Sequence, residues 1–213
     1  MTQVKICGLN DAEGYDAAVA AGANHVGFVF YPPSPRAVSP AQAAALASRH
    51  PGGPRRVGLL VDASDAEIEA ILAAVPLDIL QLHGEETPAR ATALRQRFGL
   101  PVMKALGIAE AADLALLDSY APAVDMFLLD AKPPQGASLP GGNATSFDWS
   151  LLAGRTIPRP WLLAGGLTAA NVGAAIALSG APGVDVSSGV ERARGVKDPA
   201  LIEAFVRAAR RPR

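Results

Sequence analysis

Short apolar runs recur along the whole chain, separated by longer stretches rich in Ala, Leu, Glu and Arg. Each run is bounded by Gly, Pro or polar residues, which is typical of a β-strand that is covered on both faces. The pattern predicts eight strands, over residues 4–7, 25–30, 57–61, 77–82, 102–106, 126–130, 161–164 and 184–187.

The stretches between these runs carry signals for the start of a helix. A Ser followed three residues later by Gln or Glu forms a capping box, and a Thr-Pro or Asp-Pro pair places a cap before a proline that suits the first helical turn. The signals are Ser39 with Gln42, Ser64 with Glu67, Thr87-Pro88 and Asp198-Pro199. Helices are therefore predicted to alternate with the strands.

This alternation predicts a parallel sheet with right-handed crossovers. Eight strand–helix units within 213 residues fit one domain, a (β/α)8 TIM barrel over residues 1–213. The main alternative is a doubly wound open sheet. Its glycine-rich fingerprint does not follow the first predicted strand, where the chain reads Cys7-Gly8-Leu9-Asn10, and the barrel is therefore favoured.

Composition narrows the class of protein further. The chain is 50% hydrophobic, and its 19 basic and 20 acidic residues nearly cancel, so no overall field attracts nucleic acid or an anionic membrane surface. No apolar run approaches the ~18 residues of a membrane span. A single cysteine excludes an internal disulfide and a cysteine-based zinc cluster. We expect a cytoplasmic protein that acts on a small molecule.

Catalytic groups of a barrel enzyme lie at the carboxyl ends of the strands, and two reactive side chains fall there. Cys7 ends the first strand, with Lys5 on the same face by alternation, and Asp130 ends the sixth. Cys7 is either a small buried hydrophobe or a base or nucleophile activated by a neighbouring cation. Asp130 either pairs with Lys104 or Lys132, or is a general acid whose pKa is raised in a dry pocket.

Two glycine-containing loops follow the seventh and eighth strands. Such loops let backbone N–H groups approach an anion closely, and barrel enzymes often bind phosphate at these positions. The residues concerned are Gly165, Gly166, Ser187, Ser188 and Gly189. They predict a site for one phosphate group.

The remaining polar candidates are less specific. His83 follows the fourth strand and is either a ligand contact or a histidine held under a loop, and Arg36 lies in the proline-rich loop after the second strand. No two histidines have the spacing of metal ligands, so no metal site is expected.

At these residues the sequence resembles the phosphoribosylanthranilate isomerases of tryptophan biosynthesis. The matching segments occur in the family's order over almost the whole chain, which makes the set specific although each segment alone is weak. They are Lys5-Ile6-Cys7-Gly8, Gly27-Phe28-Val29-Phe30 with Ser34-Pro35-Arg36, Gln81-Leu82-His83-Gly84, Leu129-Asp130, Phe147-Asp148-Trp149, Ala164-Gly165-Gly166-Leu167, and residues 184–191.

The resemblance implies a cofactor-free Amadori rearrangement of N-(5-phosphoribosyl)anthranilate to 1-(2-carboxyphenylamino)-1-deoxyribulose 5-phosphate. It assigns Asp130 as the general acid that protonates the ring oxygen, and Cys7 as the base that takes the proton from the ribose C2. Arg36 would hold the anthranilate carboxylate. Gly166, Ser187, Ser188 and Gly189 would help to bind phosphate. Lys5 and His83 join the candidate substrate-binding residues, and a homodimer is possible.

One segment departs from the family pattern. Residues 141–146 lack the second glycine pair and the lysine that the family usually shows before Phe147.

Two other functions fit the sequence less well. The related isomerase of histidine biosynthesis uses two carboxylates and two phosphate sites, which disagrees with Cys7. A non-catalytic barrel that binds phosphorylated metabolites would not need both Cys7 and Asp130.

Overall fold

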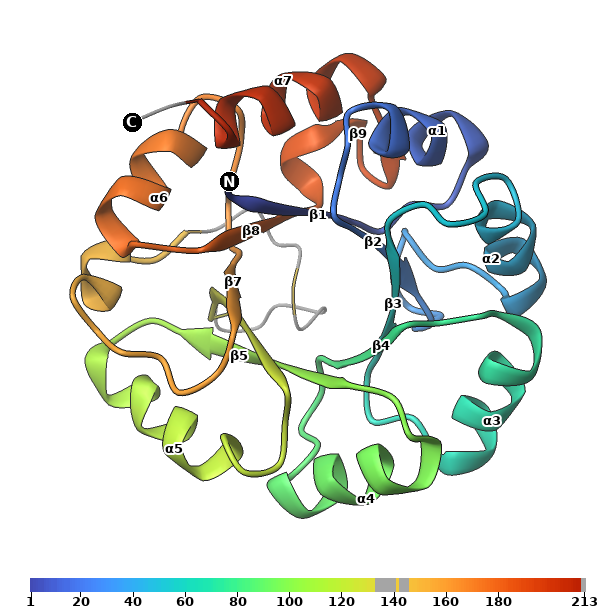
Figure 1. The fold of residues 1–213 in the computed structure, drawn as a ribbon, viewed down its shortest axis with the longest axis horizontal. Coiled ribbons are helices and arrows are strands. Elements are labelled where there is room, and N and C mark those ends of the chain that lie inside the picture. Colours follow the sequence, from blue (N-terminus) through green and yellow to red (C-terminus); the bar gives the residue numbers. More distant parts are fainter. Residues whose placement is uncertain (133–140, 142–145, 212–213) are drawn as a thin grey trace.

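The computed structural model describes residues 1–132, 141 and 146–211. Eight parallel strands close into a barrel in the order of the chain, and helices form a ring around it, which confirms the predicted TIM barrel (Figure 1). The strands are β1 (Gln3–Cys7), β2 (His25–Val29), β3 (Arg55–Leu60), β4 (Ile79–Leu82), β5 (Val102–Ile108), β6 (Met126–Ala131), β7 (Trp161–Leu163) and β8 (Gly183–Val186). Pairing of β1 with β8 closes the barrel.

The helices begin where the sequence signals place them. Ser39 and Ser64 form complete capping boxes, and Thr87 and Asp198 accept hydrogen bonds from the first turns of their helices. The α-helices of the described residues are α1 (Ala12–Ala20), α2 (Pro40–Ala47), α3 (Asp65–Ala74), α4 (Pro88–Phe98), α5 (Leu116–Tyr120), α6 (Val172–Ser179) and α7 (Pro199–Ala209).

The connection from β6 to β7 differs from the predicted α-helix. Its helical part, as far as the structure describes it, is a single 3-10 turn, η2 (Trp149–Leu152). Gly154 follows in the left-handed region, with φ 67°, and Pro158 and Pro160 come soon after. Proline lacks the N–H that continues a helix, so this stretch cannot extend the turn. Before β6, a 3-10 segment, η1 (Ala111–Ala115), leads into the short α5.

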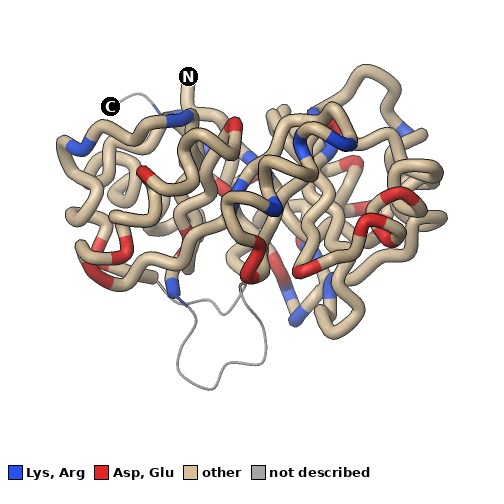
Figure 2. Tube along the Cα trace, turned by 90° about the horizontal axis from the view of Figure 1, so that it is seen from below, with Lys and Arg blue, Asp and Glu red and all other residues tan. Residues whose placement is uncertain are grey.

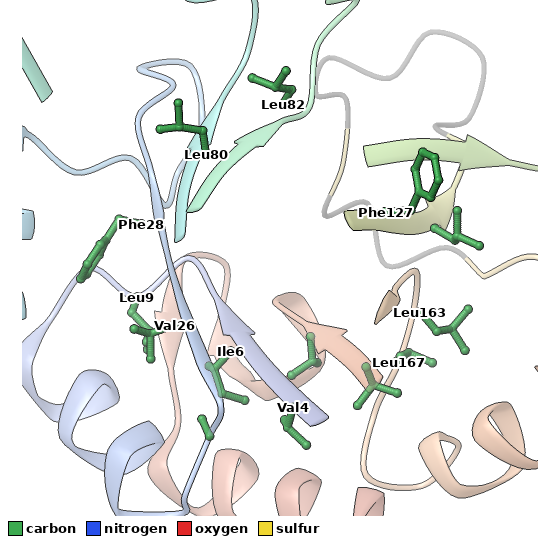
Figure 3. Packing of buried hydrophobic residues seen from close by; sticks show 14 of the residues in the cluster. Val4, Ile6, Leu9, Val26, Phe28, Leu80, Leu82, Phe127, Leu163 and Leu167 are labelled. Atoms are coloured by element: carbon green, nitrogen blue, oxygen red, sulfur yellow. The ribbon is translucent and has the colours of Figure 1, made fainter. Parts of the chain in front are cut away.

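Side chains alternate between the inside of the barrel and the layer under the helices. Val4 and Ile6 of β1, and Val26 and Phe28 of β2, belong to the large cluster that packs between strands and helices (Figure 3). The inside of the barrel holds a smaller apolar cluster that includes Val57, Ile79, Met103, Leu128 and Leu162. The period-two pattern thus puts Lys5 and Cys7 inside the barrel.

A two-stranded hairpin that the sequence pattern did not predict lies between β8 and α7. It consists of β9 (Glu191–Ala193) and β10 (Val196–Lys197), after a short 3-10 turn, η3 (Ser188–Val190). Acidic and basic positions are interspersed over the molecule in the view of Figure 2. Within residues 1–132, 141 and 146–211, no helix combines the length and the apolar character that a membrane crossing needs.

Candidate active site

The carboxyl ends of the barrel strands surround one pocket, as expected for this fold. Nine of the ten candidate site residues line it, and Lys5 lies beneath it. The nine are Cys7, Arg36, His83, Asp130, Gly165, Gly166, Ser187, Ser188 and Gly189. The closed barrel therefore brings together residues that lie up to 182 positions apart in the sequence.

Cys7 ends β1 and its side chain points into the pocket, with 5% of the residue exposed. Its neighbour across the strand pair is Gly27, where a Cβ would stand 3.0 Å from Cys7 Sγ and 3.3 Å from Lys5 Nζ. The absent side chain at Gly27 therefore makes room for both groups. Burial raises the pKa of the Cys7 thiol above its ordinary value, and the nearby ammonium groups of Lys5 and Lys197 oppose this shift.

Asp130 lies near the end of β6, on the other side of the pocket. Its Oδ1 accepts a hydrogen bond of 2.8 Å from the backbone N–H of Ala131. Burial raises the pKa of Asp130 to about 7, helped by the negative charge of Asp185 and opposed by the Ala131 N–H and by Lys5. Lys104 and Lys132, its alternative partners, instead form ion pairs with Glu86 and Asp113. Asp130 is thus a carboxyl group that can be protonated near neutral pH.

His83 lies between Asp130 and the buried side chain of Gln81. Its Nε2 is 3.6 Å from Asp130 Oδ2, and Gln81 Nε2 is 3.1 Å from its Nδ1. With the Gln81 amide in this orientation, its nitrogen donates to Nδ1 and the ring proton sits on Nε2, toward Asp130. Burial, with the positive charges of Lys5 and Lys104, lowers the pKa of His83 to about 3, so the ring is neutral.

Lys5 is fully buried and forms an ion pair with Asp185, the Nζ–Oδ1 distance being 2.7 Å. Burial alone would disfavour its charge, but the carboxylate of Asp185 raises the pKa of Lys5, so the ammonium stays charged. Asp185 itself lines the pocket. Lys5 therefore acts on the pocket through its charge and through its neighbours Cys7 and Asp185.

Arg36 projects from the loop after β2 and is held by a bidentate ion pair. Its Nε and Nη2 donate to the two carboxylate oxygens of Glu191, at 2.7 and 3.0 Å. Both side chains are about 95% buried. The pair fixes one edge of the guanidinium plane, and the residue still lines the pocket.

The loops after β7 and β8 form the glycine-rich wall of the pocket. Gly165 and Gly166 have φ values of 90° and 61°, in the left-handed region that favours glycine. A Cβ on Gly189 would stand 1.9 Å from the carbonyl oxygen of Leu167, so only glycine allows the two loops to pack this closely. Asn171 braces the first loop by donating to the carbonyl of Gly166 and accepting from the N–H of Thr168. The wall presents backbone groups without intervening side chains.

Sequence reasoning missed several functional neighbours. The motifs that match the family contain Asp185, Gln81 and Glu191, but no separate role was predicted for them. A charged or amide side chain in an apolar strand, as at Asp185 and Gln81, is itself a signal of a functional position. Asp185 faces Lys5 only because β1 and β8 are adjacent in the closed barrel. Lys197 carried no signal, because its place depends on the β9–β10 hairpin.

The segment that departs from the family pattern lies mostly outside the described residues, which include only Gly141 and Ser146 of residues 141–146. Gly141 lines the pocket, and a Cβ there would stand 2.6 Å from His83 Nε2. Among the residues that the structure describes, no group of three His, Cys, Asp or Glu side chains could hold a metal ion.

Comparison with known proteins agrees with this geometry. The model of the family "N-(5'phosphoribosyl)anthranilate (PRA) isomerase" matches residues 4–208. The N-(5'-phosphoribosyl)anthranilate isomerase of Paracoccus denitrificans is 60% identical over 209 residues, which cover 98% of this chain and 97% of that protein.

Solved structures give the same result. Monomers generated from the dimeric phosphoribosylanthranilate isomerase of Thermotoga maritima superimpose with a TM-score of 0.82 at 36% identity, covering 98% of each chain. A phosphoribosylanthranilate isomerase in complex with reduced 1-(o-carboxyphenylamino)-1-deoxyribulose 5-phosphate gives a TM-score of 0.83 at 35% identity, again covering 98% of each chain. The chain belongs to the N-(5'-phosphoribosyl)anthranilate isomerase family.

Proposed function

We propose that Asp130 and Cys7 are the acid and the base of the isomerisation that this family carries out. Family membership gives the activity, the isomerisation of N-(5'-phosphoribosyl)anthranilate in tryptophan biosynthesis. The observation that carries the assignment is that one pocket contains both a carboxyl group with a pKa of about 7 and the single cysteine of the chain. The pocket thus holds one group that can donate a proton near neutral pH and one that accepts a proton as a thiolate, which are the two roles of acid–base catalysis.

Asp130 acts first. Its protonated carboxyl group donates the proton to the ribose ring oxygen, the bond from C1 to that oxygen breaks, and the nitrogen lone pair forms the C1–N double bond of a Schiff base. The pKa of about 7 leaves about half of the carboxyl groups protonated at neutral pH, whereas a carboxyl with its ordinary pKa would be almost fully ionised.

Cys7 acts second. Its thiolate takes the proton from C2. The electron pair of that C–H bond forms the C1–C2 double bond, and the π pair of the C1–N bond returns to the nitrogen, which gives an enolamine. The enol then loses its hydroxyl proton and C1 gains one, which yields the ketone with no net change in protons. Only the thiolate is basic enough for this step, and the charges of Lys5 and Lys197 favour it against the effect of burial.

The other pocket residues bind the two anionic ends of the substrate. We propose that Arg36 holds the carboxylate of the aromatic ring, and that Gly165, Gly166, Ser187, Ser188 and Gly189 hold the phosphate. His83 Nε2 lies 3.6 Å from Asp130 Oδ2, so a shift of less than about 1 Å would let it donate to the carboxylate that forms after ring opening. Lys5 supports the site from below through its charge, without a direct contact to substrate.

The proposed steps use only side chains, with no cofactor or metal. We further propose that residues 1–213 form one catalytic domain. The dimeric state described for the Thermotoga maritima relative supports a homodimer here.

The test is an assay of freshly prepared N-(5'-phosphoribosyl)anthranilate in chelator-treated buffer, for the wild type, Asp130→Asn and Cys7→Ser. Removing a general acid or base typically costs about 10² to 10⁴ in rate. We expect both variants to lose activity on that scale while keeping the circular dichroism spectrum of the wild type. Full activity of either variant would refute the role of that residue.

A further inference from the structure

Three buried charges meet behind the wall of the pocket, and two of them belong to the β9–β10 hairpin. Glu191 of β9 lies between Arg36 and Lys197 of β10, with Arg36 Nε at 2.7 Å and Lys197 Nζ at 2.8 Å from its Oε1. The side chains are 5%, 4% and 0% exposed for Arg36, Glu191 and Lys197. Because water is excluded there, the contacts among these charges are strong, and each side chain is held in one orientation.

Each carboxylate oxygen of Glu191 accepts two hydrogen bonds. Besides the two bonds to its Oε1, its Oε2 accepts from Arg36 Nη2 at 3.0 Å and from the backbone N–H of Gly195 at 3.1 Å. Gly195, in the hairpin turn, has φ 80°, and a Cβ there would stand 2.6 Å from the carbonyl oxygen of Pro35. The turn therefore packs directly on the loop that carries Arg36.

The hairpin is also tied to the reacting side of the pocket. Lys197 Nζ donates to the carbonyl oxygen and the hydroxyl of Ser187, at 3.0 and 3.2 Å. The Ser187 hydroxyl in turn donates to the carbonyl oxygen of Cys7 at 3.1 Å. One connected network thus joins Arg36 with the ends of β1 and β8.

The arrangement leaves a defined edge of Arg36 for another ligand. A guanidinium has five N–H donors, and the ion pair with Glu191 uses one on Nε and one on Nη2. The remaining three are the two on Nη1 and the second on Nη2. One from each nitrogen forms the end edge of the fork, beside the edge that Glu191 occupies. That edge matches a second carboxylate.

The charge balance also favours an anionic ligand. Arg36 and Lys197 contribute two positive charges and Glu191 contributes one negative charge, so the network carries one excess positive charge behind the pocket wall. Hydrogen bonds from Arg36 and Lys197 outweigh burial and hold the pKa of Glu191 down at about 2, so its negative charge persists through the neutral range. Burial lowers the pKa of Lys197, and the charge of Glu191 opposes that shift.

We propose that Glu191 and Lys197 are positioning residues, which fix the guanidinium of Arg36 so that its free edge receives the carboxylate of the substrate's aromatic ring. Glu191 holds the guanidinium and Lys197 holds Glu191. The inference rests on the proposed role of Arg36 and adds the reason for its orientation. Neither hairpin residue is placed against the substrate. Their effect on the carboxylate runs through Arg36, while Lys197 also acts on Cys7 through its charge and on Ser187 through its hydrogen bonds.

The test compares two stable ligands by titration calorimetry. One is reduced 1-(o-carboxyphenylamino)-1-deoxyribulose 5-phosphate, and the other is its phenylamino counterpart without the carboxylate. The ratio of their dissociation constants is the carboxylate preference, which a charge-assisted hydrogen-bonded contact makes about tenfold to a hundredfold. The variants are Arg36→Met, the double variant Glu191→Gln with Lys197→Gln, and the exposed control Glu203→Gln.

The double variant keeps the formal charge of the network at one positive, so a change reports on position rather than on charge. We expect it to lose about tenfold of the carboxylate preference. Both ligands carry the phosphate, so any effect of Lys197 on Ser187 cancels in this ratio. Glu203→Gln should retain the wild-type ratio. The single variant Glu191→Gln serves the same comparison where the double variant does not fold.

The outcomes separate the two proposals. A folded double or single variant with the wild-type carboxylate preference would overturn the positioning role, provided that Arg36→Met has lost the preference. Retention of the preference in Arg36→Met would instead overturn the proposed role of Arg36, and the positioning role with it.

Discussion

Lys5 and Asp185 are register partners across the seam that closes the barrel, and Lys5 Nζ lies 2.7 Å from Asp185 Oδ1. The ion pair lies at the floor of the pocket and acts on both reactive groups. The negative charge of Asp185 raises the pKa of Asp130 and of Cys7, while Lys5 lowers both. Removing Asp185 takes away this negative charge, which pushes the two pKa values down while Lys5 remains protonated. Loss of the Lys5 charge, which Asp185 supports, would act in the opposite direction.

Asp185→Asn is therefore expected to move the pH profile of kcat/KM. The active form needs a protonated Asp130 and an ionised Cys7. The rate rises with the thiolate fraction until the pH reaches the pKa of Asp130, about 7, and then levels off because protonated Asp130 is lost as fast as thiolate is gained. In Asp185→Asn with Lys5 still protonated, the plateau should begin below pH 7. An unchanged break in the profile, against the exposed control Glu203→Gln, would show that Asp185 does not tune the acid.

Asp130→Asn is expected to stabilise the fold as it abolishes activity. The pKa of Asp130 is raised from its ordinary 3.8 to about 7 on folding, so ionisation costs folding free energy that grows between pH 4 and pH 7 and is constant above. Three pH units correspond to as much as about 4 kcal/mol. Asparagine can keep the hydrogen bond from Ala131 without that cost.

Chemical denaturation at pH 4 and pH 8 measures this effect. The stability gain of Asp130→Asn should be small at pH 4 and large at pH 8. Asp16→Asn provides a control of opposite sign, since Arg49 and His50 hold the pKa of Asp16 down at about 2 and its removal should destabilise the fold above pH 4. An equal gain for Asp130→Asn at both pH values would contradict the raised pKa.

Cys7 is expected to react slowly with a small alkylating reagent near pH 7. Only the thiolate reacts, and burial keeps the thiol pKa above its ordinary value. The alkylation rate, followed by mass spectrometry on the single cysteine, should rise by about tenfold per pH unit from pH 7 to pH 9. A fast rate that is flat over this range would mean that the thiolate already predominates.

Gly189→Ala tests the glycine-rich wall. Its Cβ would meet the carbonyl oxygen of Leu167 at 1.9 Å, so the loops after β7 and β8 must separate. We expect the inhibition constant of inorganic phosphate and KM to rise by about tenfold or more, as when a charge-assisted contact is lost. Gly173→Ala in α6 is the matched control, because nothing lies within 4 Å of its Cβ position. Competition by phosphate that survives in Gly189→Ala would contradict a phosphate site at this wall.

The parts of the fold that local chemistry determines could be predicted. Ser39 and Ser64 cap their helices as the spacing to Gln42 and Glu67 predicts. All eight strands lie within about two residues of the apolar runs. Helix caps and strands could be predicted because each depends on residues that are close in the sequence. In the described part of the connection between β6 and β7, residues 146–160, a 3-10 turn replaces the helix that the alternation of units predicts, since Gly154 and the prolines that follow do not continue a helix.

The candidate site likewise has residues that could be placed from the sequence and residues that could not. Cys7 and Asp130 could be placed at strand ends from the sequence, because any parallel barrel gathers strand ends on one face. The ion pair of Lys5 with Asp185 and the network of Arg36 with Glu191 could not, because they join residues 180 and 155 positions apart. Charged residues within apolar strands point to the pair of Lys5 with Asp185. Only the register of β1 with β8 shows that these two residues are neighbours.

The most direct measurement follows the proton at C2. Substrate carrying deuterium at C2 is incubated with the wild type and with Cys7→Ser, and loss of the label from C2 is followed by NMR, with binding of the reduced product analogue confirming an intact pocket. We expect the label to leave C2 with the wild type, and to remain there over the same time with Cys7→Ser. Loss of the label at the wild-type rate in Cys7→Ser would contradict the assignment of Cys7 as the base.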